Sequence, residues 1–223
     1  METILTASAF VLGFILVIIT VPPIIRIARL KNLFEPFEER KVHTQIVPPL
    51  GGVAIFLGFV LSTIVSTDGL SFDSLKYIIA SVIMMFFIGL KDDLLVISAR
   101  KKIIVQIFAA VLLITLGGVQ ITNLHGIFVI YQIDYFVGVV LTLFVMLALI
   151  NAYNLIDGID GLASGLAIFA ASVLGSWLLI SGHIQFAIMS FALMGSLSGF
   201  FMYNVFGKKN KLFMGDTGSL VIG

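Results

Sequence analysis

The stretch GLASGLAIFAASVLGSWLLISGHIQFAIMSFALMGSLSGFFMYNVFG, residues 161–207, contains no Asp, Glu, Lys or Arg. A helix needs about 20 consecutive apolar residues to cross a bilayer, so this stretch is long enough for two crossings. Its middle carries Ser181, Gly182 and His183, a combination that favours a turn. The stretch therefore predicts two membrane helices that are joined at residues 181–183.

Further segments without these charged residues lie upstream, at residues 3–25, 42–67, 77–90, 103–133 and 135–156. The segment 77–90 is short for a crossing, and we expect its helix to cover 75–95. We expect an interfacial hairpin or a short amphipathic element at 120–135. Because another apolar run follows Asp216, the sequence predicts an all-α polytopic membrane protein with seven complete transmembrane helices and the start of an eighth.

The composition excludes an ordinary soluble domain. Of 223 residues, 60% are hydrophobic and 11% are charged, whereas about 25% are charged in soluble proteins. The net charge of +1 provides no basic field for nucleic acid, so nucleic acid is not an expected partner. The chain has no cysteine, which excludes thiol nucleophiles and metal-thiolate sites. Any chemistry must come from oxygen and nitrogen groups.

The basic residues predict the orientation. Every Lys and Arg except Lys76 follows the first, third or seventh predicted helix. Short loops rich in Lys and Arg stay on the cytoplasmic side, so the N-terminus is expected outside. The expected cytoplasmic loops are about 26–49, 91–102, 154–162 and 207–216, and residues 1–223 are expected to form a single integral membrane domain.

Five acids fall in these cytoplasmic loops: Asp92, Asp93, Asp157, Asp160 and Asp216. The adjacent carboxylates at 92 and 93 repel unless a cation holds them, and magnesium takes one or two carboxylates plus substrate phosphate. An isolated Asp-Asp pair is otherwise a solvated helix end. Taken together, acids at one membrane surface favour a metal-bridged polyphosphate that reacts with a lipid-borne partner.

A stripe of polar residues ends the fifth predicted helix. Asn151, Asn154 and Asp157 recur at a spacing of three and share one helix face, and we expect Asp160 to continue it. The alternative is a turn built from Asp-Gly pairs, which explains the glycines but not both asparagines. Asp216 is by default the N-cap of the next helix, although the backbone N–H groups there could equally meet a phosphate.

The stretch from Arg40 to Gly52 collects basic residues and Pro48-Pro49 before the second predicted helix. Basic clusters beside a membrane usually set topology or meet anionic lipids. His43 is the residue in this stretch that neither role requires.

These stretches resemble the motifs of the polyprenyl-phosphate N-acetylhexosamine-1-phosphate transferase family, which is related to phospho-N-acetylmuramoyl-pentapeptide translocase. The resemblance runs from about Asn32 to Gly223, and the first motif is more similar to the N-acetylhexosamine branch. The motifs occupy, in order, residues 40–52, 89–106, 151–163 and 213–219.

The resemblance implies transfer of a sugar-1-phosphate, with GlcNAc-1-phosphate the expected group, from a UDP-N-acetylhexosamine to undecaprenyl phosphate with release of UMP. This is the first membrane step of a cell-envelope glycan pathway, and it implies a multi-pass protein of the bacterial inner membrane with a cytoplasmic active site. The implied cofactor is Mg²⁺, with Mn²⁺ as the alternative ion. A homodimer is left open.

The resemblance also implies residue roles. Asp92, Asp93 and Asp160 match catalytic acids, with Asp92 as the base that keeps the lipid phosphate deprotonated. Asp157 and Asp93 match metal-binding acids. The positions that match nucleotide or phosphate contacts are Asn151, Asn154, Lys102, Asp216, His43 and Arg40.

Two departures from the family matter. Some members carry a third acid where this chain has Val96, which speaks against a three-acid metal cluster. Members also continue with further helices and a His-containing cytoplasmic loop, whereas this sequence stops at Gly223, within the apolar run after Asp216. We therefore expect a C-terminally truncated chain and a partial set of site residues.

Two other classes of membrane protein share some of these features. A CDP-alcohol phosphatidyltransferase also joins Asp-Gly motifs to magnesium, but its motif carries an arginine soon after Asp-Gly, and none follows Asp157-Gly158 closely here. A cation-coupled transporter would place its carboxylates near the bilayer midplane. The acids of this chain cluster at one predicted surface instead.

Overall fold

The computed structural model describes residues 2–31, 33, 47–67, 75–208 and 210–223, and this described part is helical with only an isolated β-bridge between Asn123 and Gln132. The helices are α1 (Glu2–Leu30), α2 (Gly51–Ser66), α3 (Leu75–Leu95), α4 (Ala99–Thr115), α5 (Tyr135–Ile156), α6 (Leu162–Ile180), α7 (Ile184–Val205) and α8 (Gly215–Ile222), with a 3-10 turn at Ile127–Val129. The expected all-α class is confirmed for this part of the chain.

The predicted break at residues 181–183 is confirmed. α6 ends at Ile180, and Gly182 adopts a left-handed φ of 78°. The N–H of His183 donates to the carbonyl of Leu178 at 2.9 Å, which closes the end of α6 before α7 begins. A glycine at this position is typical of a helix C-terminus because it has no Cβ to clash.

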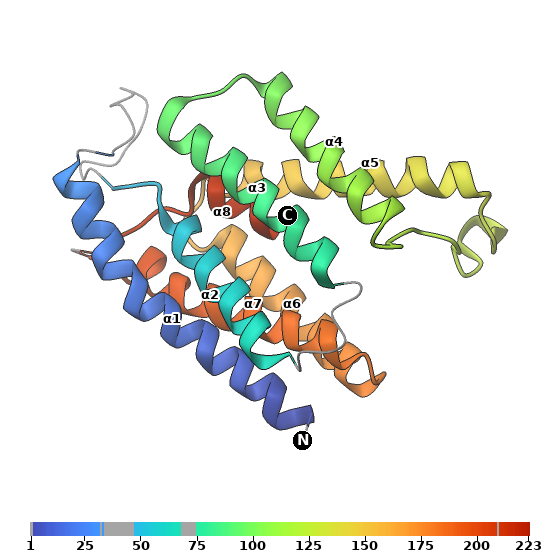
Figure 1. Ribbon diagram of the computed structural model, residues 1–223, viewed down its shortest axis with the longest axis horizontal. Helices are drawn as coiled ribbons and strands as arrows, with labels where there is room; N and C mark the ends of the chain where they lie inside the picture. Colours follow the sequence, from blue (N-terminus) through green and yellow to red (C-terminus); the bar gives the residue numbers. More distant parts are fainter. Residues whose placement is uncertain (1, 32, 34–46, 68–74, 209) are drawn as a thin grey trace.

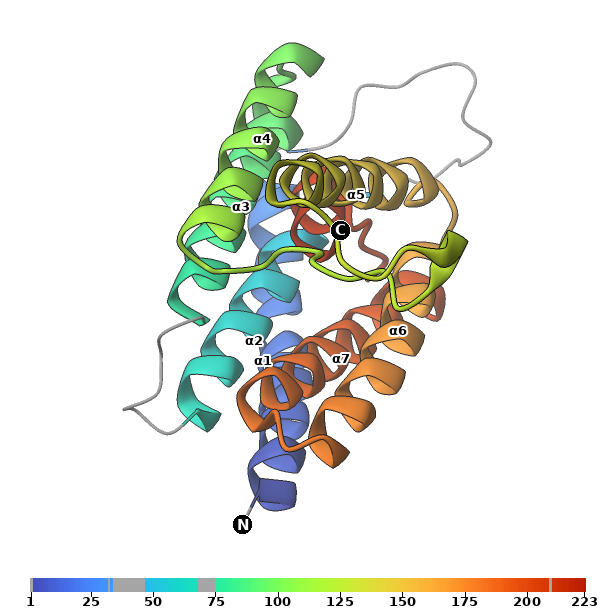
Figure 2. The ribbon, with the colours of Figure 1, turned by 90° about the vertical axis from the view of Figure 1, so that its right-hand side faces the viewer.

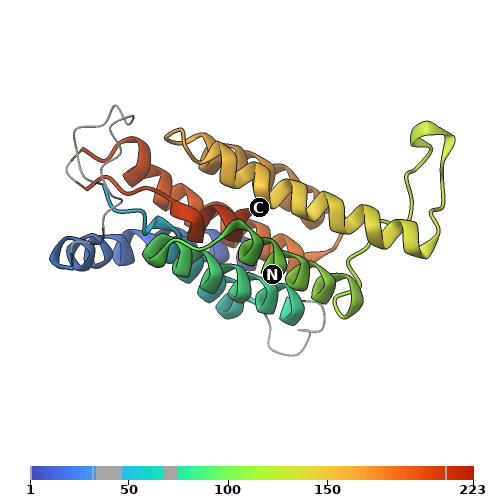
Figure 3. The same cartoon turned by 90° about the horizontal axis from the view of Figure 1, so that it is seen from above.

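Two other predicted elements are confirmed. α3 covers 75–95, the extended range expected around the short uncharged segment. Residues 121–133 form a hairpin, in which Leu124 N donates to Tyr131 O at 2.9 Å and Ile133 N donates to Thr122 O at 3.1 Å. Figure 3 shows this hairpin, between α4 and α5, projecting beyond the other helices.

Among the described residues, four helices are long and apolar enough to cross a membrane, namely α1, α5, α6 and α7. α2 has 16 residues, which gives about 24 Å at about 1.5 Å per residue, short of the roughly 30 Å hydrocarbon core. α3 and α4 carry charged residues at their ends that shorten their apolar parts. The expectation of seven complete crossings is therefore supported for four helices by length and composition.

The helix surfaces suit a lipid environment. Large apolar side chains point outward, with Phe87, Phe108, Phe144, Phe169 and Trp177 each more than 60% exposed. Inside, small residues allow some helices to approach closely: Gly13 lies against the backbone of Ala192, where an added Cβ would be 2.6 Å from the carbonyl oxygen. Large residues outside and small residues between helices are typical of membrane helix packing.

The helix ends sort to two sides. Figure 1 shows the end of α1, the start of α2, the end of α3, the start of α4 and the end of α7 at the upper left, opposite the N-terminus and the turn between α6 and α7. α5 runs across the direction of α1, α2 and α3 (Figure 2). Its C-terminal end meets α8, which contacts α2, α3 and α5 and is buried from Thr217 to Val221. The short α8 is thus a central element.

Candidate active site

The start of α8 is fixed by the start of α2. Gly51 N donates to Phe213 O and Gly52 N donates to Met214 O, both at 2.8 Å, while Phe213 N donates to Pro48 O at 3.1 Å. A Cβ on Gly52 would overlap the backbone of Gly218. Only glycine at position 52 lets the two helix starts approach this closely.

Asp93 at the end of α3 caps α8 from a distant part of the chain. Its Oδ1 accepts the N–H of Asp216 at 2.7 Å, and its Oδ2 accepts the N–H of Thr217 at 2.9 Å and the hydroxyl of Thr217 at 2.5 Å. The first N–H groups of a helix lack partners within the helix. Asp93 therefore supplies the acceptors that a local N-cap residue would otherwise provide.

The default expectation that Asp216 is the N-cap of α8 is wrong. α8 begins at Gly215, which adopts a φ of 72°, and the N-cap position is Met214 without a side-chain hydrogen bond. The alternative was that backbone N–H groups at this helix start bind a phosphate. The N–H groups of Asp216 and Thr217 donate to Asp93 instead. The Asp216 carboxylate does not cap α8 and points toward α4 and α5.

Asp216 and Asp92 are joined by Lys102. The Lys102 ammonium lies 2.5 Å from Asp92 Oδ2 and also pairs with Asp216 Oδ2. Asp92 holds the turn between α3 and α4 as well, because its Oδ1 accepts the N–H of Ile97 at 2.6 Å. The ends of α3, α4 and α8 thus converge on two carboxylates that share one cation.

The polar stripe of α5 meets this cluster in part. Asn154 Nδ2 donates to Asp216 Oδ1 at 2.6 Å and to Ser219 Oγ at 2.9 Å. Asn151 lies one turn away and donates to Gln106 of α4 at 3.0 Å. The expected shared face is therefore present, but only its C-terminal half reaches α8.

Asp157 is the C-cap residue of α5 and lies beyond its apolar span. Burial, together with the negative charges of Asp216 and Asp93, raises the pKa of Asp157 to about 7. A hydrogen bond from the Gly215 backbone opposes this shift. A cation would stabilise the charged form of a partly buried carboxyl near other carboxyls.

Asp160 does not continue the stripe, so that expectation is wrong. α5 ends at Ile156, and the following turn, with Gly161 at a φ of 75°, directs Asp160 away from the helix face. Asp160 pairs instead with Lys211 in the loop after α7. Its predicted catalytic role stays a prediction, and it lies beside the cluster, at 34% exposure, not within it.

Arg40 and His43 lie outside the described residues, so their predicted phosphate contacts stay predictions.

Three structural residues of the site were not expected from sequence. Thr217 binds Asp93, Lys211 binds Asp160, and Asn204 near the end of α7 receives the N–H of Gly161 at 2.7 Å and donates to Leu212 O at 3.0 Å. Asn204 carried a detectable signal, since it is an amide near the C-terminal end of an apolar helix. The partners of Thr217 and Lys211 lie far away in sequence, and no spacing rule links them.

The carboxylate oxygens of the site are of the kind that a magnesium ion takes. Within the described ranges, no three Asp, Glu or His side chains come together as a protein-only metal cage. Magnesium seldom needs such a cage, because it takes one or two carboxylates together with phosphate oxygens and water. Asp157 offers one such carboxylate and Asp216 a second, whose two oxygens face the side chains of Asn154 and Lys102. Both oxygens of Asp93 instead accept backbone N–H groups of α8.

Known proteins are similar to this sequence over most of its length. A protein matched from Bacillus subtilis (strain 168), named "Probable undecaprenyl-phosphate N-acetylglucosaminyl 1-phosphate transferase", is 31% identical over 217 residues, 96% of this chain and 59% of its own. The undecaprenyl-phosphate alpha-N-acetylglucosaminyl 1-phosphate transferase of Escherichia coli (strain K12) is 31% identical over 89% of this chain and 54% of its own. The protein of the same name from Salmonella typhi is 33% identical over 82% and 50%.

The chain therefore spans between half and three fifths of the length of these relatives. The sequence model of glycosyl transferase family 4 matches residues 75–223, a range that contains each acid of the site. This match covers well over half of the sequence, and the chain belongs to glycosyl transferase family 4.

Proposed function

We propose that the protein transfers GlcNAc-1-phosphate from UDP-GlcNAc to undecaprenyl phosphate and releases UMP, as the first membrane step of a cell-envelope glycan pathway. The names of the matched relatives support the donor sugar and the acceptor lipid. The observation that carries the proposal is the convergence of Asp92, Asp157 and Asp216 with Lys102 at one end of the helical bundle.

In the proposed reaction, an oxygen of the lipid phosphate attacks the sugar-bearing phosphorus of the UDP-sugar. A new phosphoanhydride bond forms as the bond to the departing UMP breaks, so charge and protons balance without water. Such transfers depend on positioning and on cationic groups around the phosphate oxygens. Asp92 would keep the lipid phosphate deprotonated, and Lys102 and Asn154 would meet phosphate or nucleotide oxygens.

Magnesium is part of this proposal, with Mn²⁺ as the alternative. Asp157 and Asp216 would hold the ion, which when bound would neutralise the diphosphate of the donor. Without it, the burial of Asp157 beside other negative groups is unfavourable, as its pKa of about 7 indicates. The metal-binding role predicted for Asp93 is secondary in this proposal, because backbone N–H groups of α8 engage both of its oxygens, whereas only the side chains of Asn154 and Lys102 engage those of Asp216.

We further propose that α2, α3 and α4 also cross the bacterial inner membrane. Seven crossings with the N-terminus outside place the ends of α3, α5 and α7 on the cytoplasmic side, together with the basic residues that follow α1, α3 and α7. This arrangement gives the site access to a soluble nucleotide-sugar and to a lipid phosphate in the same leaflet.

The test is release of UMP from UDP-GlcNAc and undecaprenyl phosphate by the purified protein in detergent with Mg²⁺. Asp92→Asn and Asp157→Asn should each lower the rate about a hundredfold or more. The matched control is Asp134→Asn, because Asp134 caps α5 at the opposite end and asparagine is an equally good N-cap. The proposal is wrong if the unmodified protein releases no UMP, or if both site variants keep its rate.

A further inference from the structure

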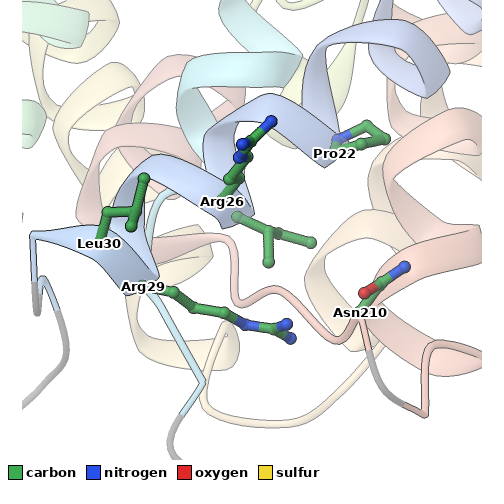
Figure 4. Close-up of a pocket in the computed structure, with 6 residues that line it drawn as sticks. Pro22, Arg26, Arg29, Leu30 and Asn210 are labelled. Atoms are coloured by element: carbon green, nitrogen blue, oxygen red, sulfur yellow. The ribbon is translucent and has the colours of Figure 1, made fainter.

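Two features of the described part of the chain lie outside the candidate active site. One is a hollow of about 330 Å³ at the end of α1, lined by Pro22, Ile25, Arg26, Arg29, Leu30 and Asn210. Its two arginines do not converge, because Arg26 points away from Arg29 and Asn210 (Figure 4). The other feature is the hairpin between α4 and α5, which lies at the opposite end of the molecule (Figure 1).

The tip of this hairpin is apolar and exposed. Ile127, Val129 and Ile130 are 59%, 86% and 45% exposed, and Tyr131 beside them is 64% exposed. Residues 127–131, IFVIY, contain none of the Gly, Asn, Asp or Ser residues that turns facing water usually carry. Such a tip suits an apolar environment.

The backbone of the tip is hydrogen-bonded within the hairpin. Six N–H groups around the turn donate to acceptors of the same hairpin, namely those of residues 124, 125, 126, 127, 129 and 130. Backbone N–H groups without a partner are costly in lipid, because no water is present to replace the partner. The tip can therefore enter an apolar layer without exposing these donors to it.

Val129 has a strained backbone, with a φ of 64°. A β-branched residue is rarely found in this conformation, whereas Gly, Asn and Asp tolerate it. Because 86% of its surface is exposed, contacts inside the protein do little to offset the strain. An apolar environment outside the protein would favour a valine side chain at this position.

The base of the hairpin is fixed to the first turns of α5. Ile121 N donates to Thr142 Oγ1 and Gln120 Nε2 donates to Tyr135 O, both at 2.9 Å. A Cβ on Gly138 would lie 2.7 Å from Ile121 O, so the two segments approach closely. A movement of the hairpin would therefore move this end of α5.

The exposed apolar face of α5 begins beside the hairpin. α5 is long and apolar enough to cross a membrane, and 11% of its apolar segment is buried by the rest of the described protein. Phe136, Val140 and Phe144 recur at helical spacing on it and are 76%, 66% and 68% exposed. Tyr131 and Tyr135 are exposed at the junction, and tyrosines are enriched where a membrane meets water. The hairpin thus joins α5 where the lipid-facing surface of this helix starts.

We propose that the hairpin tip, residues 126–131, inserts into the bilayer leaflet around the start of α5 and anchors this end of the helix. Lipid covers the apolar side chains of the tip, and the tyrosines lie near the headgroups. The proposal does not depend on the transferase activity, because it uses only the hairpin, α5 and the membrane.

The test uses tryptophan as a depth probe, because Trp177 is the only tryptophan in the chain. Trp177→Phe provides the background, into which Ile127→Trp or Tyr131→Trp is introduced. Phe144→Trp, in the middle of α5, is the matched reference for a side chain deep in lipid. The full chain is reconstituted into phosphatidylcholine vesicles that carry bromine either near the headgroup or near the ends of the acyl chains, and quenching of tryptophan fluorescence is measured.

Bromine near the headgroup should quench both hairpin probes more strongly than bromine at the chain ends, and the reference should show the reverse order. Quenching by aqueous acrylamide alone, to the extent seen for free N-acetyltryptophanamide, would place the tip in water and overturn the proposal. Protection from both bromine and acrylamide would show that protein covers the tip, as in a contact with a second copy, and would overturn it as well.

Val129→Asp gives a second measurement, in which the two environments predict opposite signs. Aspartate tolerates a φ of 64° better than valine, so in water the substitution should raise the Tm. In lipid the carboxylate is unfavourable, and the Tm in bilayer nanodiscs should fall. An unchanged or raised Tm in nanodiscs would overturn the anchoring role.

Discussion

At the scale of single residues, Lys102 holds two carboxylates of the site together. Its ammonium pairs with both Asp92 and Asp216, so these two acids share one cation. The lysine side chain is 21% exposed, so solvent screens the pairs only in part. The stability of the site should therefore depend on either this lysine or an added cation.

Lys102→Met tests this dependence. In EDTA, the variant should lose about 1–2 kcal/mol of stability, because two carboxylates lose their partner. Added Mg²⁺ should raise the Tm of the variant more than that of the unmodified protein. Lys101→Met, at an exposed neighbouring position, is the control and should change neither value. Equal Tm values for the three proteins in EDTA would show that Lys102 carries no such role.

Asp93 could act as a cap of α8 or as a metal ligand. The two roles predict different effects of an Asp93 substitution on stability. If Asp93 acts through α8, Asp93→Ala should destabilise the protein by about 1–2 kcal/mol whether or not Mg²⁺ is present, and Thr217→Val should reproduce part of the loss. Thermal melts with Mg²⁺ and with EDTA provide the measurement. A loss confined to the Mg²⁺ condition would restore Asp93 as a metal ligand.

At the scale of helices, the sequence was informative wherever an apolar run has clear ends. The break at residues 181–183 and the bounds of α3 and α5 follow from charge and turn residues, and the structure confirms them. The central position of α8 could not be predicted, because a short apolar run does not identify its neighbours. The turn that diverts Asp160 escaped prediction too, since helical spacing assumes that the helix continues.

The sequence indicates which residues belong to the site, but it does not indicate all of the contacts that they make. The asparagines and aspartates of α5 could be recognised from their spacing, but the cap that Asp93 provides to Asp216 and Thr217 joins residues more than a hundred positions apart. Local patterns report which side chains share a face. They do not report which distant helix end will need an acceptor.

The contact between α2 and α8 gives a prediction for glycine. Gly52→Ala should push the two helix starts apart, because its Cβ would overlap Gly218, and should cost about 1–3 kcal/mol together with most of the UMP release. Gly158→Ala is the matched control, since a Cβ there meets nothing within 4 Å. Thermal melting and UMP release measure both. An unaltered Gly52→Ala protein would mean that the site does not require this close contact.

At the scale of the whole molecule, a shared site requires that loops far apart in sequence lie on one membrane face. The charge distribution predicts this, and the structure brings the ends of α3, α5 and α7 to the same end of the bundle as the start of α8 (Figure 1). Length and composition support four of the seven expected crossings directly. The others are shorter or carry charge at their ends, so hydropathy alone could not establish them.

The absence of cysteine makes this arrangement directly measurable, because one introduced cysteine is the only thiol in the chain. Ser98→Cys, Gly158→Cys and Ser181→Cys each place a thiol at an exposed turn. A membrane-impermeant maleimide applied to intact cells should label Ser181→Cys, and should label the other two only after permeabilisation. Labelling of Ser98→Cys and Gly158→Cys from opposite faces would contradict a shared site for Asp92 and Asp157.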